Sequence, residues 1–404
     1  SWSSPALPAP WPRSVDIVAS IESLDRDILR QLAGHEPGRP VLSVFARTDP
    51  RDPANTNHSP AWEIELRNGL GAIEKSLRAN GSHDGHAEFL RLRERVEKEL
   101  AGLDPAARAR SVAWFIDADG ELSRRFSLQI PLRRDRVVWD RRPFISPLVD
   151  VVDRGTATGV VVVDGERVRL LEIDLGQVSE PPDSTYTITL GDWREHQGAA
   201  APNPARGQQT VSHRERYEAR VDEQRDKLFE RAAQATASRL EELGWERVAL
   251  VGEPKVLGQF SAELPAHLAD RVVARVEHNT GHEEPSAIAA VVGEELERVW
   301  LERTLALADE ARERAAAGGA GAVGPQETLG AIGEARVAHL LFDPGVELAG
   351  FAAAAPAVLE GPPEMLSERA VEATIQAGGE VSAVSGEDSA ALRDAGGMAA
   401  LLRY

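Results

Sequence analysis

A glycine and two glutamines stand just before the longest helical pattern of the chain. The segment 202–210 contains Gly207, Gln208 and Gln209. Glycine lets a backbone come close to a ligand, and a glutamine amide offers both a donor and an acceptor without charge. This segment can therefore hydrogen-bond to a polar ligand, but the same composition is typical of an ordinary surface loop. The residues alone leave both interpretations open.

Two groups of arginines have the chemistry for RNA contact. One surrounds the glutamines and the other occupies 124–142, where seven arginines against Asp135 and Asp140 give a local balance of +5 in a chain of −19. Phe126 and Trp139 lie within this run and are suited to stacking on bases. The alternative is an arginine-rich sheet edge that discourages aggregation. The candidates are Arg206, Arg214, Arg216 and Arg220 near the glutamines, and Arg124, Arg125, Arg133, Arg134, Arg136, Arg141 and Arg142 in the run.

Residues for metal or nucleophilic catalysis are not grouped. Cysteine is absent and the ten histidines are scattered, so we predict no metal site and no cofactor. Four acids of a predicted hairpin have the chemistry to hold metals for phosphodiester cleavage, which keeps a metal-dependent nuclease as a weaker alternative to solvated acids. These acids are Asp164, Glu166, Glu172 and Asp174. Gly252-Glu253-Pro254-Lys255 follows a predicted strand but lacks a phosphate-loop pattern.

The composition bounds the classes of protein that remain. A chain of 404 residues with 42% hydrophobic and 27% charged residues predicts two or three globular domains. The formal charge of −19 argues against nucleic-acid binding by the whole surface. The longest aliphatic run is 160–163, far too short for a membrane span. We expect a cytoplasmic protein without a membrane partner, preceded by a flexible proline-rich leader over 1–13.

The elements of the first part follow from hydrophobic periodicity. Ile21, Leu24, Ile28 and Leu32 recur every three or four residues and predict a helix. We expect the last three strands of this part to form a meander, and 14–144 to form one α/β domain. The predicted elements are a strand at 41–46, helices around 62–77 and 89–100, and strands at 112–116, 126–130 and 137–139.

The remainder also alternates helices and strands. In the second domain, 145–314, two β-rich runs are joined by Asp164-Gly165-Glu166, a hairpin signal. A polar stretch, a long helix from about 212 to 243, a strand at 248–251 and a helix from about 286 follow. An Ala/Gly-rich linker is predicted at 315–324, and 325–404 predicts a small α/β/α sandwich. Its elements are helices at 328–333, 365–377 and 389–394, and strands at 337–342, 380–384 and 398–403.

The order of these features resembles the archaeo-eukaryotic class 1 release factors and their pelota relatives. The most specific residues are Gly378-Gly379-Glu380-Val381 and the last nine, GGMAALLRY. The segment 335–342 (ARVAHLLF) is similar to the first strand of the family's last domain. In the middle, the hairpin, the gap, the Gly-Gln segment and the Arg-rich helix come in the family's order. The bacterial branch, which overlaps Vms-like peptidyl-tRNA hydrolases and Balon-type hibernation factors, is the more similar one.

The resemblance implies a three-domain release-factor-like architecture with an RNase H-like middle domain. It also implies an activity, because the family's Gly-Gly-Gln loop enters the ribosomal peptidyl transferase centre, where its glutamine helps water attack the ester of peptidyl-tRNA. Gln208 or Gln209 would take this role, Gly207 would permit close approach, and the arginines would contact RNA. Such a mechanism needs no metal or cofactor of the protein.

The implied partners are the large ribosomal subunit, peptidyl-tRNA and, as an open alternative, a translational GTPase. Ile73-Glu74-Lys75-Ser76 falls inside a predicted helix, so no codon-reading motif is found and we expect ribosome rescue or quality control. One glycine precedes the glutamines, where the family has two. This keeps open a second hypothesis, in which the protein occupies the A site of idle ribosomes without catalysis.

Overall fold

The computed structural model describes most of the chain, as two compact units. The described residues are 24–35, 40–57, 59–79, 83–102, 109–188, 207–278 and 283–404. The predicted leader over 1–13 lies outside them. The first unit consists of Ser1–Leu24, Pro37–Ser127 and Arg134–Pro143, and the second of Asp25–Glu36, Leu128–Arg133 and Phe144–Tyr404.

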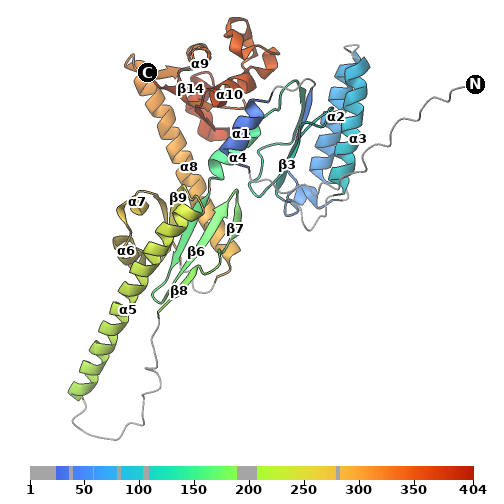
Figure 1. Ribbon diagram of the computed structural model, residues 1–404. Helices are drawn as coiled ribbons and strands as arrows, with labels where there is room; N and C mark the ends of the chain where they lie inside the picture. The colour runs from blue at the N-terminus through green and yellow to red at the C-terminus, as the bar shows by residue number, and fades with distance from the viewer. Residues whose placement is uncertain are drawn as a thin grey trace, which may run out of the picture. The chain divides into compact units, whose positions relative to one another are not determined.

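The first unit contains a four-stranded sheet in the order β3-β2-β1-β4 (Figure 1). Trp62, Leu70 and Phe89 from its two long helices pack against Val44 and Trp114 of the sheet. The predicted meander is wrong, because β1 lies between β2 and β4 and pairs with both. All six residues of β1 are buried, which suits a central strand better than an edge. The elements are β1 (Val41–Ala46), η1 (Pro53–Asn55), α2 (Ala61–Ala79), α3 (His83–Ala101), β2 (Ser111–Asp117), β3 (Ser123–Leu128) and β4 (Arg136–Asp140).

The second unit begins its main sheet with the predicted hairpin. This sheet has the order β10-β9-β5-β6-β7, and β8 also pairs with β6. β5, β6 and β7 are antiparallel neighbours, whereas β9 is parallel to β5 and β10 is parallel to β9. This order and these directions are those of an RNase H-like fold, as predicted. The strands are β5 (Thr158–Val163), β6 (Arg167–Asp174), β7 (Gln177–Ser179), β8 (Thr185–Thr187), β9 (Arg247–Gly252) and β10 (Val272–Glu277).

Helices cover both faces of this middle sheet (Figure 1). On one face, Leu228 and Phe229 of α5 and Phe260 of α6 join a core with Val161 and Leu250. On the other face, α8 contributes a core stripe formed by Ile288, Val292 and Leu296. Helices α4, α6 and α7 and strand β10 are absent from the sequence prediction. The helices from α1 to α8 that belong to the second unit, whether or not they cover this sheet, are α1 (Arg26–Ala33), α4 (Ser146–Arg154), α5 (Gly207–Glu242), α6 (Pro254–Ala262), α7 (Ala266–Ala269) and α8 (Pro285–Ala316).

The third sheet also belongs to the second unit, and it has the order β11-β14-β12-β13. The second half of α8 packs on it through Ala311, beside Leu401 and Val384. The predicted α/β/α sandwich is confirmed. Within the predicted linker, the structure has the end of α8 and β11, which pairs with β14. The elements are β11 (Gly321–Val323), α9 (Pro325–Gly333), β12 (Val337–Phe342), η5 (Ala349–Ala354), η6 (Ala357–Leu359), η7 (Pro363–Met365), α10 (Leu366–Gln376), β13 (Glu380–Ala383), η8 (Gly386–Ser389), α11 (Ala390–Asp394) and β14 (Met398–Leu402).

Within the described ranges, no helix combines the length and the apolar character that crossing a membrane requires.

Candidate functional site

The predicted glutamines stand at the start of the longest helix of the structure. α5 begins at Gly207, so Gln208 and Gln209 fall in its first turn. The prediction placed the start of this helix near 212, about one turn later. The side chains over 207–220 lie outside the described residues, as does Arg206. The roles of Arg206, Arg214, Arg216 and Arg220 in RNA binding therefore stay predictions.

Arginines of the second half of α5 hold the helix on the middle sheet. Each of three guanidinium groups donates a hydrogen bond to a backbone carbonyl, two of them in loops between strands and one at the end of β8. The bonds run from Arg225 Nε to Gly165 O (3.1 Å), from Arg231 Nη2 to Thr187 O (3.2 Å) and from Arg239 Nη2 to Pro182 O (2.8 Å). Charge-assisted bonds of this kind are stronger than neutral ones, so they define where α5 lies on the sheet.

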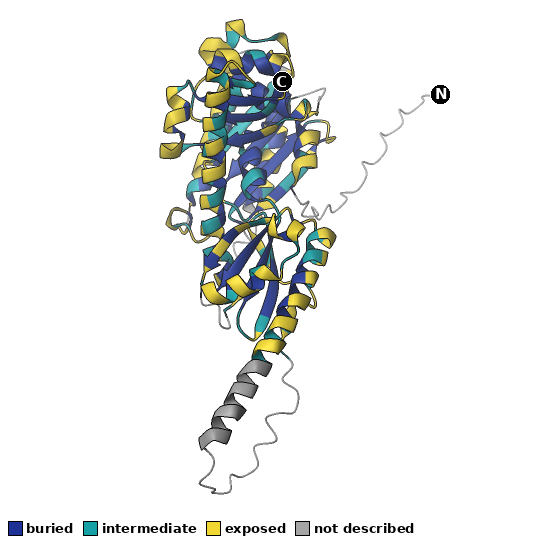
Figure 2. Cartoon of the chain, turned by 90° about the vertical axis from the view of Figure 1, so that its left-hand side faces the viewer, coloured by how far each residue is buried: buried dark blue, intermediate teal, exposed yellow. Residues whose placement is uncertain are grey.

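Apolar packing completes this attachment. Leu228, Phe229, Ala232 and Ala233 of α5 are at most 2% exposed, and Phe229 meets Phe260 of α6 edge to face, with ring centroids 5.6 Å apart. Figure 2 shows this half of α5 with a buried side and an exposed side. From Gly207 to Arg225 the helix rises about 27 Å at 1.5 Å per residue. The glutamines therefore lie far along α5 from the residues that attach it.

The arginines of the basic run over 124–142 are divided between the two units. Arg133 belongs to the second unit and the other arginines of the run belong to the first. Arg133 donates to both carboxylate oxygens of Asp150, at 3.1 and 3.0 Å, and Arg125 lies 4.0 Å from Glu99. Arg141 is exposed, while Arg124, Arg136 and Arg142 are half-buried. RNA contact by Arg124, Arg125, Arg133, Arg134, Arg136, Arg141 and Arg142 stays a prediction, and Arg133 also has a protein partner.

The prediction that Phe126 and Trp139 stack on bases is wrong for Phe126 and weakened for Trp139. Phe126 is 0% exposed and packs edge to face with Phe115, with ring centroids 6.3 Å apart. Trp139 is half-buried in the same unit and packs edge to face with Phe89 at 5.5 Å. Both rings serve the core, because alternation along a half-buried strand turns every second side chain inward.

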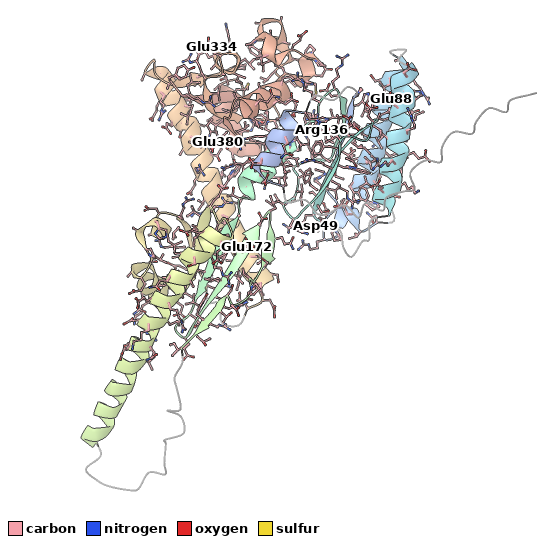
Figure 3. The ribbon with its side chains drawn as sticks, viewed as in Figure 1. Asp49, Glu88, Arg136, Glu172, Glu334 and Glu380 are labelled. Atoms are coloured by element: carbon pink, nitrogen blue, oxygen red, sulfur yellow. The ribbon has the colours of Figure 1, made fainter. Side chains whose placement is uncertain are left out.

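The hairpin acids do not converge. Asp164 accepts hydrogen bonds from the N–H groups of Glu166 and Arg167 and so closes the turn after β5. Glu172, near the far end of β6, accepts from Trp245 Nε1 at 3.0 Å (Figure 3). The seven steps along β6 from Arg167 to Asp174 span about 23 Å at 3.3 Å per residue. Asp164 and Asp174 therefore cannot share a metal ion, and this geometry speaks against the nuclease alternative.

Burial raises the pKa of Asp174, and the neighbouring carboxylates of Glu172 and Asp25 raise it further. Among the residues that the structure describes, no group of three His, Asp or Glu side chains is placed to hold a metal. One sequence signal was overlooked, since His278 and His282 have the spacing His-x-x-x-His. His278 Nε2 lies 2.9 Å from the carboxylate of Glu283, and His282 lies outside the described residues.

Buried charged groups gather where β5 and β9 begin, a region that we call the amino edge of the middle sheet, together with α4. Arg247 donates to Thr158 Oγ1 and to the carbonyls of Arg154 and Thr156, and burial lowers its pKa. Arg154 donates to Asp150 at 2.8 Å. Burial alone would lower the pKa of Arg154, but the carboxylates of Asp150 and Glu297 raise it above its usual value.

The amino edge also connects to the third sheet through hydrogen bonds. Asp153 Oδ2 accepts from Trp300 Nε1 at 2.8 Å and from Ser382 Oγ at 2.7 Å. Ser382 Oγ in turn lies 2.9 Å from His339 Nε2, and His339 lies 3.4 Å from Glu380, which is labelled in Figure 3. Burial lowers the pKa of His339 in spite of these carboxylates. Because these groups hydrogen-bond to one another, the network stabilises the packing of α4 and α8 against β13.

The comparison with protein families identifies the middle of the chain. Residues 143–297 match the family model described as bacterial archaeo-eukaryotic release factor family 10. This range holds the middle sheet, α5 and the glutamines. Over residues 143–297 the predicted resemblance to the bacterial branch of the release-factor superfamily is confirmed. No curated protein matches the chain.

Solved structures with similarity over much of the chain include three translation factors. The archaeal termination factor aRF1 is 16% identical over 95% of this chain and 99% of its own, with a TM-score of 0.25. Archaeal Pelota, from a model of ribosome-bound Pelota and ABCE1, is 18% identical over 71% and 74%, with a TM-score of 0.39. S. cerevisiae Dom34, described as interacting with Hbs1, is 9% identical over 73% and 86%, with a TM-score of 0.39. At TM-scores of 0.25 to 0.39 these similarities carry no argument about this chain.

Proposed function

We propose that this release-factor-like protein binds ribosomes and hydrolyses peptidyl-tRNA in ribosome rescue or quality control, without reading stop codons. The observation that carries the proposal is the place of Gly207, Gln208 and Gln209 in the first turn of a 36-residue helix. The first N–H groups of a helix have no partner within it, and they carry partial positive charge. Such donors beside a glutamine suit the oxyanion that forms when an ester is attacked.

The attachment of α5 supports this proposal mechanically. The arginine and apolar contacts fix the second half of the helix to the sheet, and the glutamines stand about 24–26 Å along the helix from Arg225, the first of these contacts. A stiff helix of this length can carry two small polar residues into a confined RNA site while its domain stays outside. Positioning of this kind can supply much of a rate enhancement. The remaining catalytic groups would belong to the ribosome.

The first unit supports a function other than codon reading. Glu74, within the sequence Ile73-Glu74-Lys75-Ser76, sits in α2 and lies 2.6 Å from Arg93 of α3. It therefore joins two helices and is not displayed in a loop. Recognition of the ribosome would come from the exposed arginines of this unit and from Arg206 and Arg214 beside the glutamines. Delivery by a translational GTPase is part of the proposal as an alternative to unaided binding.

Peptide release from stalled large-subunit complexes tests the catalytic proposal. Purified protein is mixed with 50S–peptidyl-tRNA complexes, and the released labelled peptide is measured over time. We expect release by the wild type and a loss of about 100-fold in the Gln208→Ala/Gln209→Ala double variant, the cost of removing a positioned polar group at such a site. The single variants then show which glutamine acts.

A matched control uses a glutamine on the attached half of the same helix. Gln234 is exposed on α5, so Gln234→Ala makes the same chemical change away from the helix start, and we expect wild-type release. Equal release by the double variant and the wild type would refute the catalytic role. No release by any form, together with normal ribosome binding, would instead favour the second candidate.

The second candidate is a non-catalytic factor that occupies the A site of idle ribosomes. The sequence Ala205-Arg206-Gly207-Gln208 supports this candidate, because it has one glycine before the glutamine where the family has two. Co-sedimentation with vacant ribosomes and protection of peptidyl transferase centre nucleotides from chemical modification, without peptide release, would establish it. Failure to sediment with ribosomes in any state would refute both candidates.

A further inference from the structure

A polar cavity lies where the parallel strands β5, β9 and β10 end, a region that we call the carboxyl edge of the middle sheet. Its volume is about 290 Å³, near the lower limit for small-ligand sites. Residues from several elements and their loops contribute to it. They include Asp164 after β5, Arg225 of α5, Glu253, Lys255 and Gln259 around α6, and His278 after β10.

The topology makes this edge the expected place for a ligand. The chain leaves β9 into α6, which packs on the same face of the sheet as α5. It leaves the neighbouring strand β10 toward α8, which packs on the opposite face. Neighbouring parallel strands whose connections diverge to opposite faces open a crevice at their carboxyl ends, and ligands of open α/β sheets bind in such crevices. The cavity includes residues from both of these connections.

Several polar groups of the cavity already have protein partners. Asp164 accepts from the backbone of the turn after β5. Arg225 uses Nε on Gly165 O and Nη1 on Asp222. The ring of His278 is bound to the carboxylate of Glu283. These contacts hold the wall of the cavity in place, and they leave Arg225 Nη2 near Gly165.

Three other polar side chains of the cavity have no protein partner among the described residues. Within the described part of the chain, the side chains of Glu253, Lys255 and Gln259 have no recorded hydrogen bond or ion pair, and all three are exposed. Together they present an ammonium, a carboxylate and an amide around a cavity whose lining also includes Val163 and Val256. These three groups, one cation, one anion and one neutral donor–acceptor, suit a ligand that itself carries an anion and a hydrogen-bonding ring.

We propose that this cavity binds a nucleotide, with its phosphate on Lys255 and Arg225 and the edge of its base on Gln259 and Glu253. An ammonium is a common phosphate partner. A glutamine amide can pair with a base edge, and a glutamate accepts from exocyclic amino groups such as that of cytosine. Bases that carry an exocyclic amino group therefore bind more tightly than uracil. Free nucleotides and nucleotides within RNA share this chemistry.

The binding experiment needs no ribosome. The full-length protein is titrated calorimetrically with AMP, CMP, GMP and UMP, and by fluorescence anisotropy with a short labelled single-stranded RNA. We expect one site, weakest for UMP among the mononucleotides, and a loss of at least tenfold in affinity in Lys255→Glu and about fivefold in Gln259→Ala. Glu253→Ala should remove the preference over UMP.

Lys227→Glu is the matched control. Lys227 is an exposed lysine of α5 that pairs with Glu223 and does not line the cavity. The same charge reversal there should change affinity less than twofold. Equal losses in Lys227→Glu and Lys255→Glu would mean that binding is only long-range electrostatics and would overturn the proposal. The lack of binding by every mononucleotide at millimolar concentration, and by the RNA, would also overturn it.

The two arms separate the sources of the nucleotide. Sensitivity of mononucleotide binding to Lys255→Glu identifies a free nucleotide, and sensitivity of RNA binding alone identifies a nucleotide within RNA. This inference goes beyond the proposed function and can fail independently of it. Peptide release depends on the glutamines at the start of α5, whereas nucleotide binding depends on the cavity.

Discussion

The two edges of the middle sheet use their polar residues in opposite ways. At the amino edge, the buried Asp150 and the half-buried Asp153, Arg154 and Arg247 each hydrogen-bond to protein groups. At the carboxyl edge, Glu253, Lys255 and Gln259 are exposed around a cavity. Both edges are rich in charge, so composition alone does not distinguish them. What distinguishes them is whether each charged group already has a partner.

This difference assigns the two edges to different tasks. A buried charge whose partners are satisfied contributes cohesion, and removing one partner leaves the others buried and unpaired. An exposed polar group around a cavity contributes little to stability and is available to a ligand. We therefore expect substitutions at the amino edge to change unfolding free energy, and substitutions at the carboxyl edge to change binding or the direction of α5.

The largest effect is expected at Asp150. Its carboxylate binds Arg133 and Arg154 and its side chain is 6% exposed, so Asp150→Ala leaves Arg133 without the carboxylate that it binds and Arg154 with Glu297 alone. We expect a loss of about 3–5 kcal/mol in unfolding free energy, measured by urea denaturation. Glu223→Ala breaks an exposed ion pair with Lys227 and should cost under about 1 kcal/mol. Similar costs for the two variants would erase the contrast between buried and exposed charges.

Glu368 gives a smaller effect that depends on pH. Its buried carboxylate accepts hydrogen bonds from Ser146 Oγ and Ile145 N–H at the start of α4. Burial, with the nearby charge of Glu372, raises its pKa to about 7 from 4.5. The folded state then binds more protons than the unfolded state between these values, so the contribution of Glu368 to stability is present below pH 4.5 and is lost as the pH rises through 7.

Glu368→Gln removes this titration while it keeps an acceptor for α4. At pH 8 we expect the variant to be more stable than the wild type by about 3 kcal/mol, and near pH 4 we expect the difference to disappear. Urea denaturation at both pH values measures this. A wild type whose stability relative to Glu368→Gln is constant with pH would show that Glu368 does not titrate in this range.

The smallest effect on stability is expected at Arg225, on the carboxyl edge. Arg225→Met removes the hydrogen bond to Gly165 O and should cost about 1 kcal/mol. Its larger consequence is mechanical, because Arg225 is the first of the described arginine contacts that attach α5. Since the chain has no cysteine, spin labels can be placed at Thr210→Cys and Asp270→Cys, and the distance distribution between them should broaden in Arg225→Met.

Arg225→Lys is the control for this measurement, because a lysine can still donate to Gly165 O. We expect it to restore a narrower distribution. An unchanged distance distribution in Arg225→Met would mean that apolar packing alone directs α5. The contact of Arg225 would then have no part in positioning the glutamines.

Local patterns were sufficient for much of the fold. The alternation over 325–404 predicted α9, β12, α10, β13, α11 and β14 within a few residues, because periodicity and turn residues act between near neighbours in the chain. The Asp164-Gly165 turn was predicted on the same basis. The candidate glutamines were found from their residue types and their place before a long helix, and their importance came from a family resemblance and not from spacing alone.

The rest depended on which distant segments meet. β1 lies between β2 and β4 because of pairings across more than 60 residues, and no local pattern encodes strand order. Arg133 was assigned to RNA because its neighbours are basic, yet Asp150 binds it. Lys255 and Gln259 were not singled out as binding residues, since only the packing of α6 beside the ends of β5 and β10 places them around one cavity.

Short-range physics in the chain therefore specified most helices, most strands and the polar residues at the start of α5. Tertiary packing alone decided which charges are buried in pairs and which stay available. A hydrophobic period or a glycine acts within a few residues, whereas the partner of a buried charge is chosen by the folded arrangement, as Glu368 and Ser146 show from 222 residues apart. Desolvation makes an unpaired buried charge costly. The long-range pairing of charges therefore distinguishes the amino edge of the middle sheet, where charged groups are paired, from the carboxyl edge, where some stay available to a ligand.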